Sequence, residues 1–321
     1  MTRPSAVPPP VTAVLDASSR WLPARLGEVE ELLREQGVDY GELLAGELSR
    51  TLAAGGKRLR PLLVLLCAGP DGGEGAVRAA AAIELVHMAT LVHDDVLDDA
   101  PLRRGLPTIA ATAGRSRATA VGDLLFARAF ALLGEHDEAR TIALLAAASV
   151  SLADGELAQR RDAFDAGISE QRYLDRCRLK TATLFECACL IGRDLPALGE
   201  FGAQIGLAFQ LLDDVLDVSG PAERTGKARG TDLLDGTVTL PLIVAAAADP
   251  SIAETDLRTL DAAAAERLCD RIAATGALDR VRARALDLVA SAKAQLAGDA
   301  FDAEQRQLLG LVADGVVQRY S

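Results

Sequence analysis

Residues 93–99 read H-D-D-V-L-D-D, and residues 211–217 repeat most of that pattern as L-L-D-D-V-L-D. Each run ends a long apolar segment, residues 79–99 and residues 201–218, in which helical spacing prevails and strand-like alternation is nearly absent. From Val11 onwards the chain keeps this helical pattern, with breaks at clusters of glycine and proline. The sequence therefore predicts an all-α fold in which two long helices each carry an acidic motif at one end.

The composition favours one large helical domain. Of the 321 residues, 50% are hydrophobic and only 3% are aromatic, and runs of alanine and leucine dominate. This composition is typical of helices rather than of a β-sandwich or barrel. Because no linker-like change in composition divides the chain, we expect a disordered proline-rich tail at residues 1–10 and a single all-α domain at residues 11–321.

Charge and cysteine content argue against several classes of protein. The net charge of −12 and the pI near 4.8 disfavour non-specific nucleic-acid binding, which needs a basic face. The five cysteines form no C-x-x-C pair, so we expect buried, reduced thiols in a cytoplasmic protein. No uninterrupted apolar stretch reaches the roughly 18–20 residues of a membrane span, and we expect no stable membrane insertion.

The two acidic motifs have the spacing of a metal site. Asp94 and Asp98 are four residues apart, as are Asp213 and Asp217, so each pair shares a helix face; Gln210 lies one turn before the second pair. Two adjacent carboxylates repel each other by roughly a few tenths of a kcal/mol even when they are exposed. A divalent cation removes this repulsion, and carboxylates without histidine or cysteine partners suit Mg²⁺. A solvated helix end would explain one such motif, whereas two of them favour magnesium.

Basic residues beside glycine turns can bind anions. The run G-G-K-R-L-R-P at residues 55–61 places Lys57 and Arg60 three residues apart, where they can converge on one anion. Arg103 and Arg104 follow the first acidic motif, and paired arginines can hold phosphate oxygens. The alternative interpretations are a basic surface turn and simple neutralisation of the nearby aspartates.

The two histidines near the first motif differ in their expected roles. His87 lies seven residues before Asp94, and hence on about the same helix face. Isolated histidines on apolar helices are more often structural, so only the neighbouring charged motifs favour a role for His87 at the site. His93 is expected to form structural hydrogen bonds.

In their order along the chain, these motifs resemble those of the trans-isoprenyl diphosphate synthase (polyprenyl synthase) family. The order is G-G-K-R-L-R-P, H-x-x-x-x-x-H-D-D-V-L-D, R-R-G, K-T-A, F-Q-L-L-D-D-V-L-D and G-K, and the resemblance extends over about residues 43–244. It implies an all-α, isoprenoid-synthase-type helical bundle around a central cavity, and a homodimer.

The resemblance also implies a role for each matched residue. The expected ligands of Mg²⁺, with three ions bound together with the substrate diphosphate, are Asp94, Asp98, Asp213 and Asp217. The expected catalytic residues are Asp94, Asp98, Lys180 and Asp213. The expected contacts to the allylic diphosphate are Arg103, Lys180, Thr181, Gln210 and Lys227, and those to isopentenyl diphosphate are Lys57, Arg60, His87 and Arg104.

The implied reaction is the trans condensation of isopentenyl diphosphate with an allylic diphosphate. Metal ions and cationic side chains neutralise the leaving diphosphate, so that the C–O bond ionises to an allylic cation. The double bond of isopentenyl diphosphate attacks this cation, and a proton is then lost. The departing pyrophosphate can accept that proton, which explains why no general-base side chain stands out in the sequence.

One segment departs from the family pattern G-K-x-x-G-D-D-x-x-x-G-K-x-T-L-P. Thr231 replaces the first aspartate of the pair, and Thr237 replaces the second lysine. One contact to the allylic diphosphate is therefore expected to be missing or to come from elsewhere, for which Arg229 is a candidate. Because the expected metal ligands remain, we interpret the change as subfamily variation rather than loss of activity.

Residues just before the first acidic motif are expected to set the product length. In the family, bulky aromatic side chains at these positions close the floor of the cavity, whereas this chain has Ala89 and Thr90, with Val86 about a turn further down. Small side chains leave the space open, so we expect a product longer than farnesyl, of geranylgeranyl length or longer. Other walls, around Phe126 and Phe130, can still close it.

Two other functions stay open. A class I terpene cyclase also uses an aspartate-rich motif and Mg²⁺, but it generally carries a different second metal motif and an aromatic-lined cavity. The second D-D-x-x-D motif and the low aromatic content argue against a cyclase. The chain could also be an inactive subunit of a heteromeric prenyl synthase, although its aspartates and its G-G-K-R run are intact.

Overall fold

The computed structural model describes residues 9–18, 21–36, 58–103, 105–135, 138–220 and 229–318, and these residues are mostly helical. The first helices are α1 Pro9–Ala17, α2 Trp21–Glu35, α4 Leu59–Ala68, η1 Pro70–Gly72, α5 Gly73–Leu97, α6 Ile109–Ala113, α7 Arg115–Gly134 and α8 Ala139–Asp162. They are followed by α9 Glu170–Cys177, the π-helical turn η2 Arg178–Ala182, α10 Thr183–Gly192, α11 Pro196–Ser219, α13 Thr231–Leu234 and α14 Leu240–Ala248. The last are α15 Pro250–Ala253, η3 Leu257–Thr259, α16 Ala262–Ala274, α17 Ala277–Gln295 and α18 Ala303–Gln318. Within these ranges the only strands are β1 Leu102–Arg103 and β2 Leu106–Pro107, which form an antiparallel hairpin.

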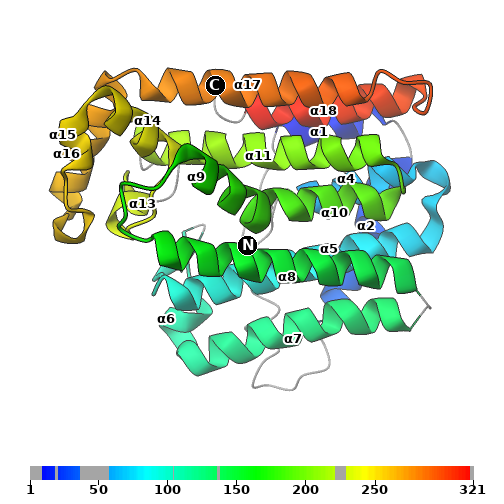
Figure 1. The fold of residues 1–321 in the computed structure, drawn as a ribbon. Helices are drawn as coiled ribbons and strands as arrows, with labels where there is room; N and C mark the ends of the chain where they lie inside the picture. Colours follow the sequence, from blue (N-terminus) through cyan, green and yellow to red (C-terminus); the bar gives the residue numbers. More distant parts are fainter. Residues whose placement is uncertain are drawn as a thin grey trace.

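The long helices lie side by side in a layered bundle (Figure 1). Helix α5 packs against α2, α4 and α7, while α11 packs against α10 and α17. Helix α10 joins these two groups because it contacts α4, α8 and α11. The buried apolar side chains of all these helices form one core cluster.

Helix α5 is a core helix because its sequence is apolar around most of its circumference. Most side chains from Val77 to Ala89 are almost inaccessible to solvent. Two helical segments of the described chain, Pro70–Leu97 and Ala139–Asp162, are long and apolar enough to cross a membrane by length and composition, a test that core helices also pass. The apolar window of the first is 67% buried and that of the second only 28%. The expectation of no stable membrane insertion therefore stays a prediction.

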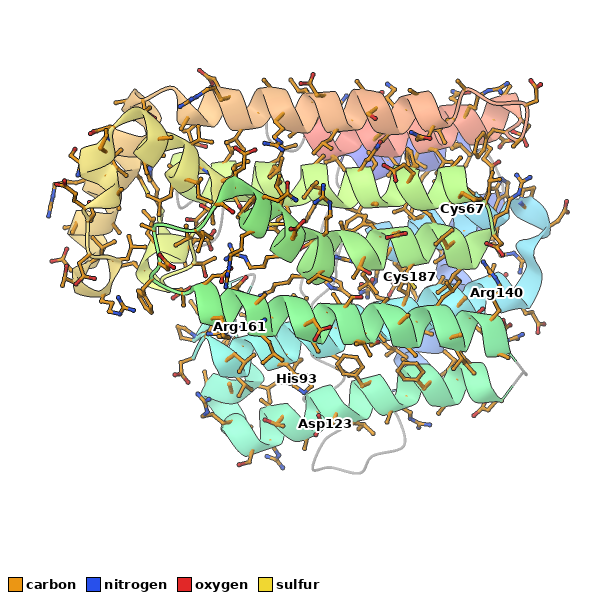
Figure 2. The ribbon with its side chains drawn as sticks, viewed as in Figure 1. Cys67, His93, Asp123, Arg140, Arg161 and Cys187 are labelled. Atoms are coloured by element: carbon orange, nitrogen blue, oxygen red, sulfur yellow. The ribbon has the colours of Figure 1, made fainter. Side chains whose placement is uncertain are left out.

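Helices α5 and α7 pack closely at Gly122. A Cβ atom there would lie 2.3 Å from Nε2 of His93, so a larger residue would displace the imidazole. The His93 ring stacks on Phe126 at a centroid distance of 5.9 Å, and its Nε2 lies 3.2 Å from Oδ1 of Asp123. Figure 2 shows His93 between the two helices, in agreement with the structural role predicted for it.

Helices α9 and α10 continue into each other through the π-helical turn η2. Gly155 of α8 and Gly206 of α11 approach this turn closely. An added Cβ atom would lie 2.6 Å from the backbone nitrogen of Lys180 in the first case and 2.8 Å from Cα of Ala182 in the second. Single π-helical turns are rare and frequently occur at functional sites.

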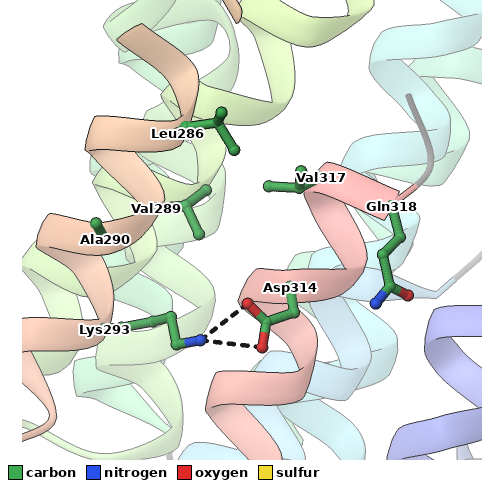
Figure 3. A pocket seen from close by; sticks show the side chains of 7 residues that line it. All are labelled: Leu286, Val289, Ala290, Lys293, Asp314, Val317 and Gln318. Carbon is green, nitrogen blue, oxygen red and sulfur yellow. Dashed lines mark hydrogen bonds and ion pairs between the residues drawn. The ribbon is translucent and has the colours of Figure 1, made fainter. Parts of the chain in front are cut away.

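An ion pair links the C-terminal helix to its neighbour (Figure 3). Nζ of Lys293 on α17 lies 2.8 Å and 3.0 Å from the two carboxylate oxygens of Asp314 on α18. Beside this pair, Leu286, Val289 and Val317 line a groove between the two helices.

The predicted all-α fold is confirmed, with the short hairpin as a local exception. Helix α1 begins at Pro9, two residues before the expected start of the domain, and proline is favoured in the first turn of a helix. The rest of the predicted tail, residues 1–8, lies outside the described residues. All five cysteines are free and buried, as predicted.

Candidate active site

Both acidic motifs lie at the same end of the bundle. The C-terminal ends of α5, α8 and α11 all point toward the short helices α13 to α16 (Figure 1). The turn η2 contacts both α8 and α11, so it lies between them at this end. The first motif occupies the last turn of α5, and the second occupies the last two turns of α11.

In the first motif, three aspartates have three different surroundings. Asp94 is half-buried, and burial raises its pKa, with the ammonium of Lys180 opposing this effect. Asp98 is the exposed C-cap residue of α5, and its Oδ1 lies 2.5 Å from a terminal nitrogen of Arg160 on α8. Asp95 is buried, and it accepts a hydrogen bond of 2.6 Å from Nε of Arg103.

The second motif repeats this distribution with other partners. Asp213 is exposed, and the half-buried Asp217 accepts a hydrogen bond of 3.3 Å from the backbone N–H of Asp232. Asp214 is only 2% exposed; it accepts hydrogen bonds of 2.5 Å from the hydroxyl of Tyr173 and 2.7 Å from the amide of Gln210.

The pKa of Asp214 reflects its burial. Burial raises the pKa of this carboxyl to about 8, and the negative charge of Asp232 acts in the same direction. The hydrogen bonds from Tyr173 and Gln210 oppose the shift, because they stabilise the carboxylate.

In both motifs, therefore, the second aspartate points into the protein and the first is more exposed. Residues four apart share a helix face, while the next residue is turned away by about 100°. Of the predicted metal ligands, Asp98 and Asp213 are exposed, and Asp94 and Asp217 are half-buried.

The π-helical turn presents two of the predicted substrate contacts. Nζ of Lys180 lies 2.5 Å from Oε2 of Glu156 on α8. The hydroxyl of Thr181 donates a hydrogen bond of 2.7 Å to Oε1 of the Gln210 side chain. Burial acts to raise the pKa of Glu156, but Lys180 and Arg160 outweigh it and hold this pKa below its usual range. The structure therefore adds Glu156 and Arg160 to the site, two residues that sequence reasoning missed.

Within the basic run at residues 55–61, the described residues Arg58 and Arg60 contact other side chains of the protein. Nε of Arg58 lies 2.5 Å from Glu30 of α2, and its Nη1 lies 2.8 Å from the buried Glu84 of α5. Burial acts to lower the pKa of Arg58, but the two glutamates outweigh it and raise this pKa above its usual value. The guanidinium carbon of Arg60 lies 4.5 Å from the ring centroid of Phe185.

The remaining predicted substrate contacts fall in two groups. His87 is half-buried on α5, and Arg103 lies on β1 beside the first motif. Lys57, Arg104 and Lys227 lie outside the described residues.

Arg229, the candidate for the replacement contact, has protein partners in this structure. Its Nη1 lies 2.7 Å from Asp270 on α16, and its Nε donates to the backbone carbonyl of Val218. These partners hold the guanidinium against α16 and the end of α11, and the contact of Arg229 with the diphosphate stays a prediction.

The residues predicted to set product length lie below the first motif on α5. Val86 and Ala89 are fully buried, with an exposed fraction of 0% each. Thr90 is half-buried, and its hydroxyl donates a hydrogen bond of 2.7 Å to the carbonyl of His87.

The donor groups at this end of the bundle fit a hard cation. They are carboxylates, and within the described ranges no three acidic, histidine or cysteine side chains come together as a metal site formed by protein alone. Magnesium is usually held by one or two carboxylates together with substrate phosphates, so separate pairs on α5 and α11 suit it. The residues that would hold it are Asp94, Asp98, Asp213 and Asp217.

Known proteins are similar to this chain in both sequence and fold. The family model "Polyprenyl synthetase" matches residues 42–272. A heptaprenyl diphosphate synthase component 2 of Geobacillus stearothermophilus is 42% identical over 226 residues, which cover 67% of this chain and 70% of that protein. A geranylgeranyl pyrophosphate synthase of Geoglobus acetivorans is 35% identical over 313 residues, or 91% of this chain and 95% of that protein. A crystal structure of a polyprenyl synthase from Caulobacter crescentus CB15, complexed with calcium and isoprenyl diphosphate, matches with a TM-score of 0.89 and 36% identity, covering 95% of this chain and 98% of that one.

The chain therefore belongs to the polyprenyl synthetase family. Its fold is the helical fold of the polyprenyl synthases, and its reaction is the trans prenyl transfer that produces an isoprenyl diphosphate. The interpretation as a class I terpene cyclase is less well supported, because these relatives are all prenyl diphosphate synthases.

Proposed function

We propose that the protein condenses isopentenyl diphosphate with an allylic diphosphate in a Mg²⁺-dependent reaction, and that the product has geranylgeranyl length or more. The observation that carries this proposal is the arrangement of two acidic helix ends around a turn that bears Lys180. Three Mg²⁺ ions, bound with the diphosphate, would supply the charge that stabilises the leaving group.

The side chains of the chain have distinct tasks in this proposal. Asp94 and Asp98 on α5, with Asp213 and Asp217 on α11, bind the metal–diphosphate from two sides. Lys180 and Arg103 add positive charge to the leaving diphosphate. The Nε of Arg103 donates to Asp95, which places this guanidinium beside the first acidic motif, where it would bind phosphate oxygens.

The proposed product length rests on the small residues below Asp94. Ala89 lies five residues before Asp94 on the same helix, and its methyl group is much smaller than the aromatic side chain that would stop chain growth there. The relatives in the comparison are named for products of different lengths, heptaprenyl and geranylgeranyl. Similarity to them therefore supports a product longer than farnesyl without selecting one length.

A product assay tests the function and the chain length together. Purified protein with Mg²⁺ and isopentenyl diphosphate is supplied with dimethylallyl, geranyl or farnesyl diphosphate, and the products are separated by chain length. We expect geranylgeranyl or longer products, and Ala89→Phe should shorten them. Farnesyl diphosphate as the end product of the wild-type protein would contradict the proposal.

We also propose that the active form is a homodimer in which α8 meets the second copy. Val150 and Leu157 are seven residues apart on α8, so they share a face, and they are 63% and 61% exposed. Large exposed apolar residues on one face are typical of an interaction surface. The buried thiols are consistent with the cytoplasmic location that forms part of this proposal.

The heteromeric alternative has one specific observation in its favour, namely that a relative is named component 2 of a heptaprenyl synthase. Light scattering combined with the activity assay separates the two cases. A dimer of this chain that is active alone supports the homodimer, and Val150→Asp should then yield monomers. A monomer that is inactive alone would favour a subunit that requires a different partner.

A further inference from the structure

Helix α8 forms a third wall of the site, and close approach at Gly155 makes this possible. Because a Cβ at Gly155 would lie 2.6 Å from the backbone nitrogen of Lys180, only glycine lets α8 come this near to the π-helical turn. The next residue, Glu156, thereby reaches Nζ of Lys180 with its Oε2, at 2.5 Å. Arg160 lies one helical turn further along the same face of α8.

Four charges of alternating sign connect the two substrate-facing elements. Oε1 of Glu156 lies 2.7 Å from Nε of Arg160, and Nη2 of Arg160 lies 2.5 Å from Oδ1 of Asp98. The order is therefore Asp98, Arg160, Glu156 and Lys180, and it runs from the end of α5 through α8 to η2.

Two of these four charged residues, Asp98 and Lys180, also have roles in the proposed reaction. The guanidinium of Arg160 and a metal ion are both cations that interact with the Asp98 carboxylate, so the charge of Arg160 opposes metal binding at this group. The ammonium of Lys180 is partly neutralised by Glu156 at 2.5 Å, and this pairing opposes its interaction with a phosphate oxygen. We therefore expect binding of the metal–diphosphate to exchange these contacts for contacts to the ligand.

We propose that Arg160 is an internal counter-ion that occupies the Asp98 carboxylate in the absence of ligand and competes with the metal ion for it. Glu156 is the positioning residue that retains Arg160 after this exchange and that holds Lys180 near the site before it. The inference rests on the proposed function, because it assumes that Asp98 is a metal ligand.

The exposures of these groups make the exchange feasible. The side chains of Arg160 and Asp98 are 39% and 29% exposed, so their ion pair is partly solvated and contributes little. Glu156 is only 16% exposed, and its contact with Arg160 has the favourable four-residue helical spacing. Arg160 therefore has a second anionic partner when it leaves Asp98.

The test measures metal binding directly. Mn²⁺ binding to the full chain is followed by electron paramagnetic resonance in the presence of inorganic pyrophosphate, and the half-saturating Mg²⁺ concentration is measured in the condensation assay. For Arg160→Gln we expect Mn²⁺ to bind about two- to fivefold more tightly, which is the range that exposed ion pairs allow. The KM for the allylic diphosphate should not rise, and Arg160→Lys should restore part of the competition.

Arg161→Gln is the matched control, because it removes the same charge from the adjacent, exposed residue of α8 (Figure 2). It should change Mn²⁺ affinity less than Arg160→Gln does. Equal effects of the two variants would overturn the proposal, since only general electrostatics would then be at work. Weaker Mn²⁺ binding or a raised KM in Arg160→Gln would also overturn it, because Arg160 would then bind substrate directly.

The same measurements separate a failure of this inference from a failure of the proposed function. If the wild-type protein neither condenses the substrates nor binds Mn²⁺ with pyrophosphate, the proposed function fails as well. If the wild type is active and Arg160→Gln has unchanged Mn²⁺ affinity, this inference alone is refuted.

Discussion

The two acidic motifs have nearly the same sequence, but their second aspartates are stabilised differently. Asp95 is paired with the guanidinium of Arg103, whereas Asp214 is hydrogen-bonded to two neutral groups, the Tyr173 hydroxyl and the Gln210 amide. A cationic partner favours an ionised carboxyl, while burial among neutral donors raises its pKa. The second aspartate of the motif is thus a counter-ion of Arg103 on α5, whereas on α11 it is a buried hydrogen-bond acceptor for Tyr173 and Gln210.

The motifs have one electrostatic problem in common. Both place carboxylates near the C-terminal end of a helix, where the helix dipole is negative and repels them. In the first motif, Arg103 and Arg160 provide positive charge. This repulsion makes the pattern unfavourable at an ordinary helix end. A bound cation relieves the repulsion, so the same pattern suits a cation-binding site.

The largest expected effect concerns Asp94, one of the proposed metal ligands. Asp94→Ala should lower condensation activity by about 10²–10³-fold or more, because one group that stabilises the charged leaving group is lost. The variant should keep its helical circular dichroism and its melting temperature within a few degrees. Asp99→Ala is the control, since Asp99 is exposed and contacts only the exposed Arg115 among the residues described. A large loss of activity in both variants would contradict the distinction between them.

Tyr173→Phe should have the next largest effect. It removes the hydroxyl that donates to Asp214 in a fully buried setting and leaves one oxygen of this carboxyl group without that donor. We expect the free energy of unfolding to fall by about 1–3 kcal/mol, as measured by urea denaturation. An unchanged stability would mean that the Tyr173–Asp214 contact does not anchor α11 to α9.

A smaller loss is expected for Asp95→Asn. Arg103 is 27% exposed, so water partly compensates for the lost carboxylate, and we expect a loss of about 1–2 kcal/mol in stability. The KM for the allylic diphosphate should rise, because Arg103 is no longer held in place. A variant with normal stability and normal KM would refute the counter-ion role of Asp95.

Asp214→Asn should have the smallest effect near neutral pH, below about 1 kcal/mol, since the amide replaces a carboxyl that is largely protonated there. The pKa of Asp214 is raised from 3.8 to about 8 in the folded protein, so the native state binds a proton that the unfolded state releases. The resulting stabilisation is fully present below about pH 4 and is lost as the pH rises through about 8. Urea denaturation of both proteins without metal, between pH 5 and 9, should show the wild type losing stability relative to the variant as pH rises. A difference independent of pH would contradict the raised pKa.

Much of the site could be predicted from spacing alone. Asp94, Asp98, Asp213 and Asp217 follow from the four-residue period of a helix, and the order of the motifs indicates the family. Glu156 and Arg160 could not be predicted, because their significance depends on the approach of α8 to a π-helical turn. The assignment of Arg229 to the diphosphate relied on proximity in sequence, whereas the tertiary structure gives it Asp270 as a partner.

The sequence by itself determined the helical class and the two acidic helix ends, and it predicted a cation–diphosphate site, because helical periodicity and side-chain chemistry are local properties. Only the tertiary structure decided which aspartates are buried, where Tyr173 and Arg103 find their partners, and that α8 lies beside Lys180. The physical reason is that burial and ion pairing depend on segments that are far apart in the chain. A single glycine such as Gly155 sets how closely α8 approaches the π-helical turn, and no periodic pattern in the sequence marks that glycine.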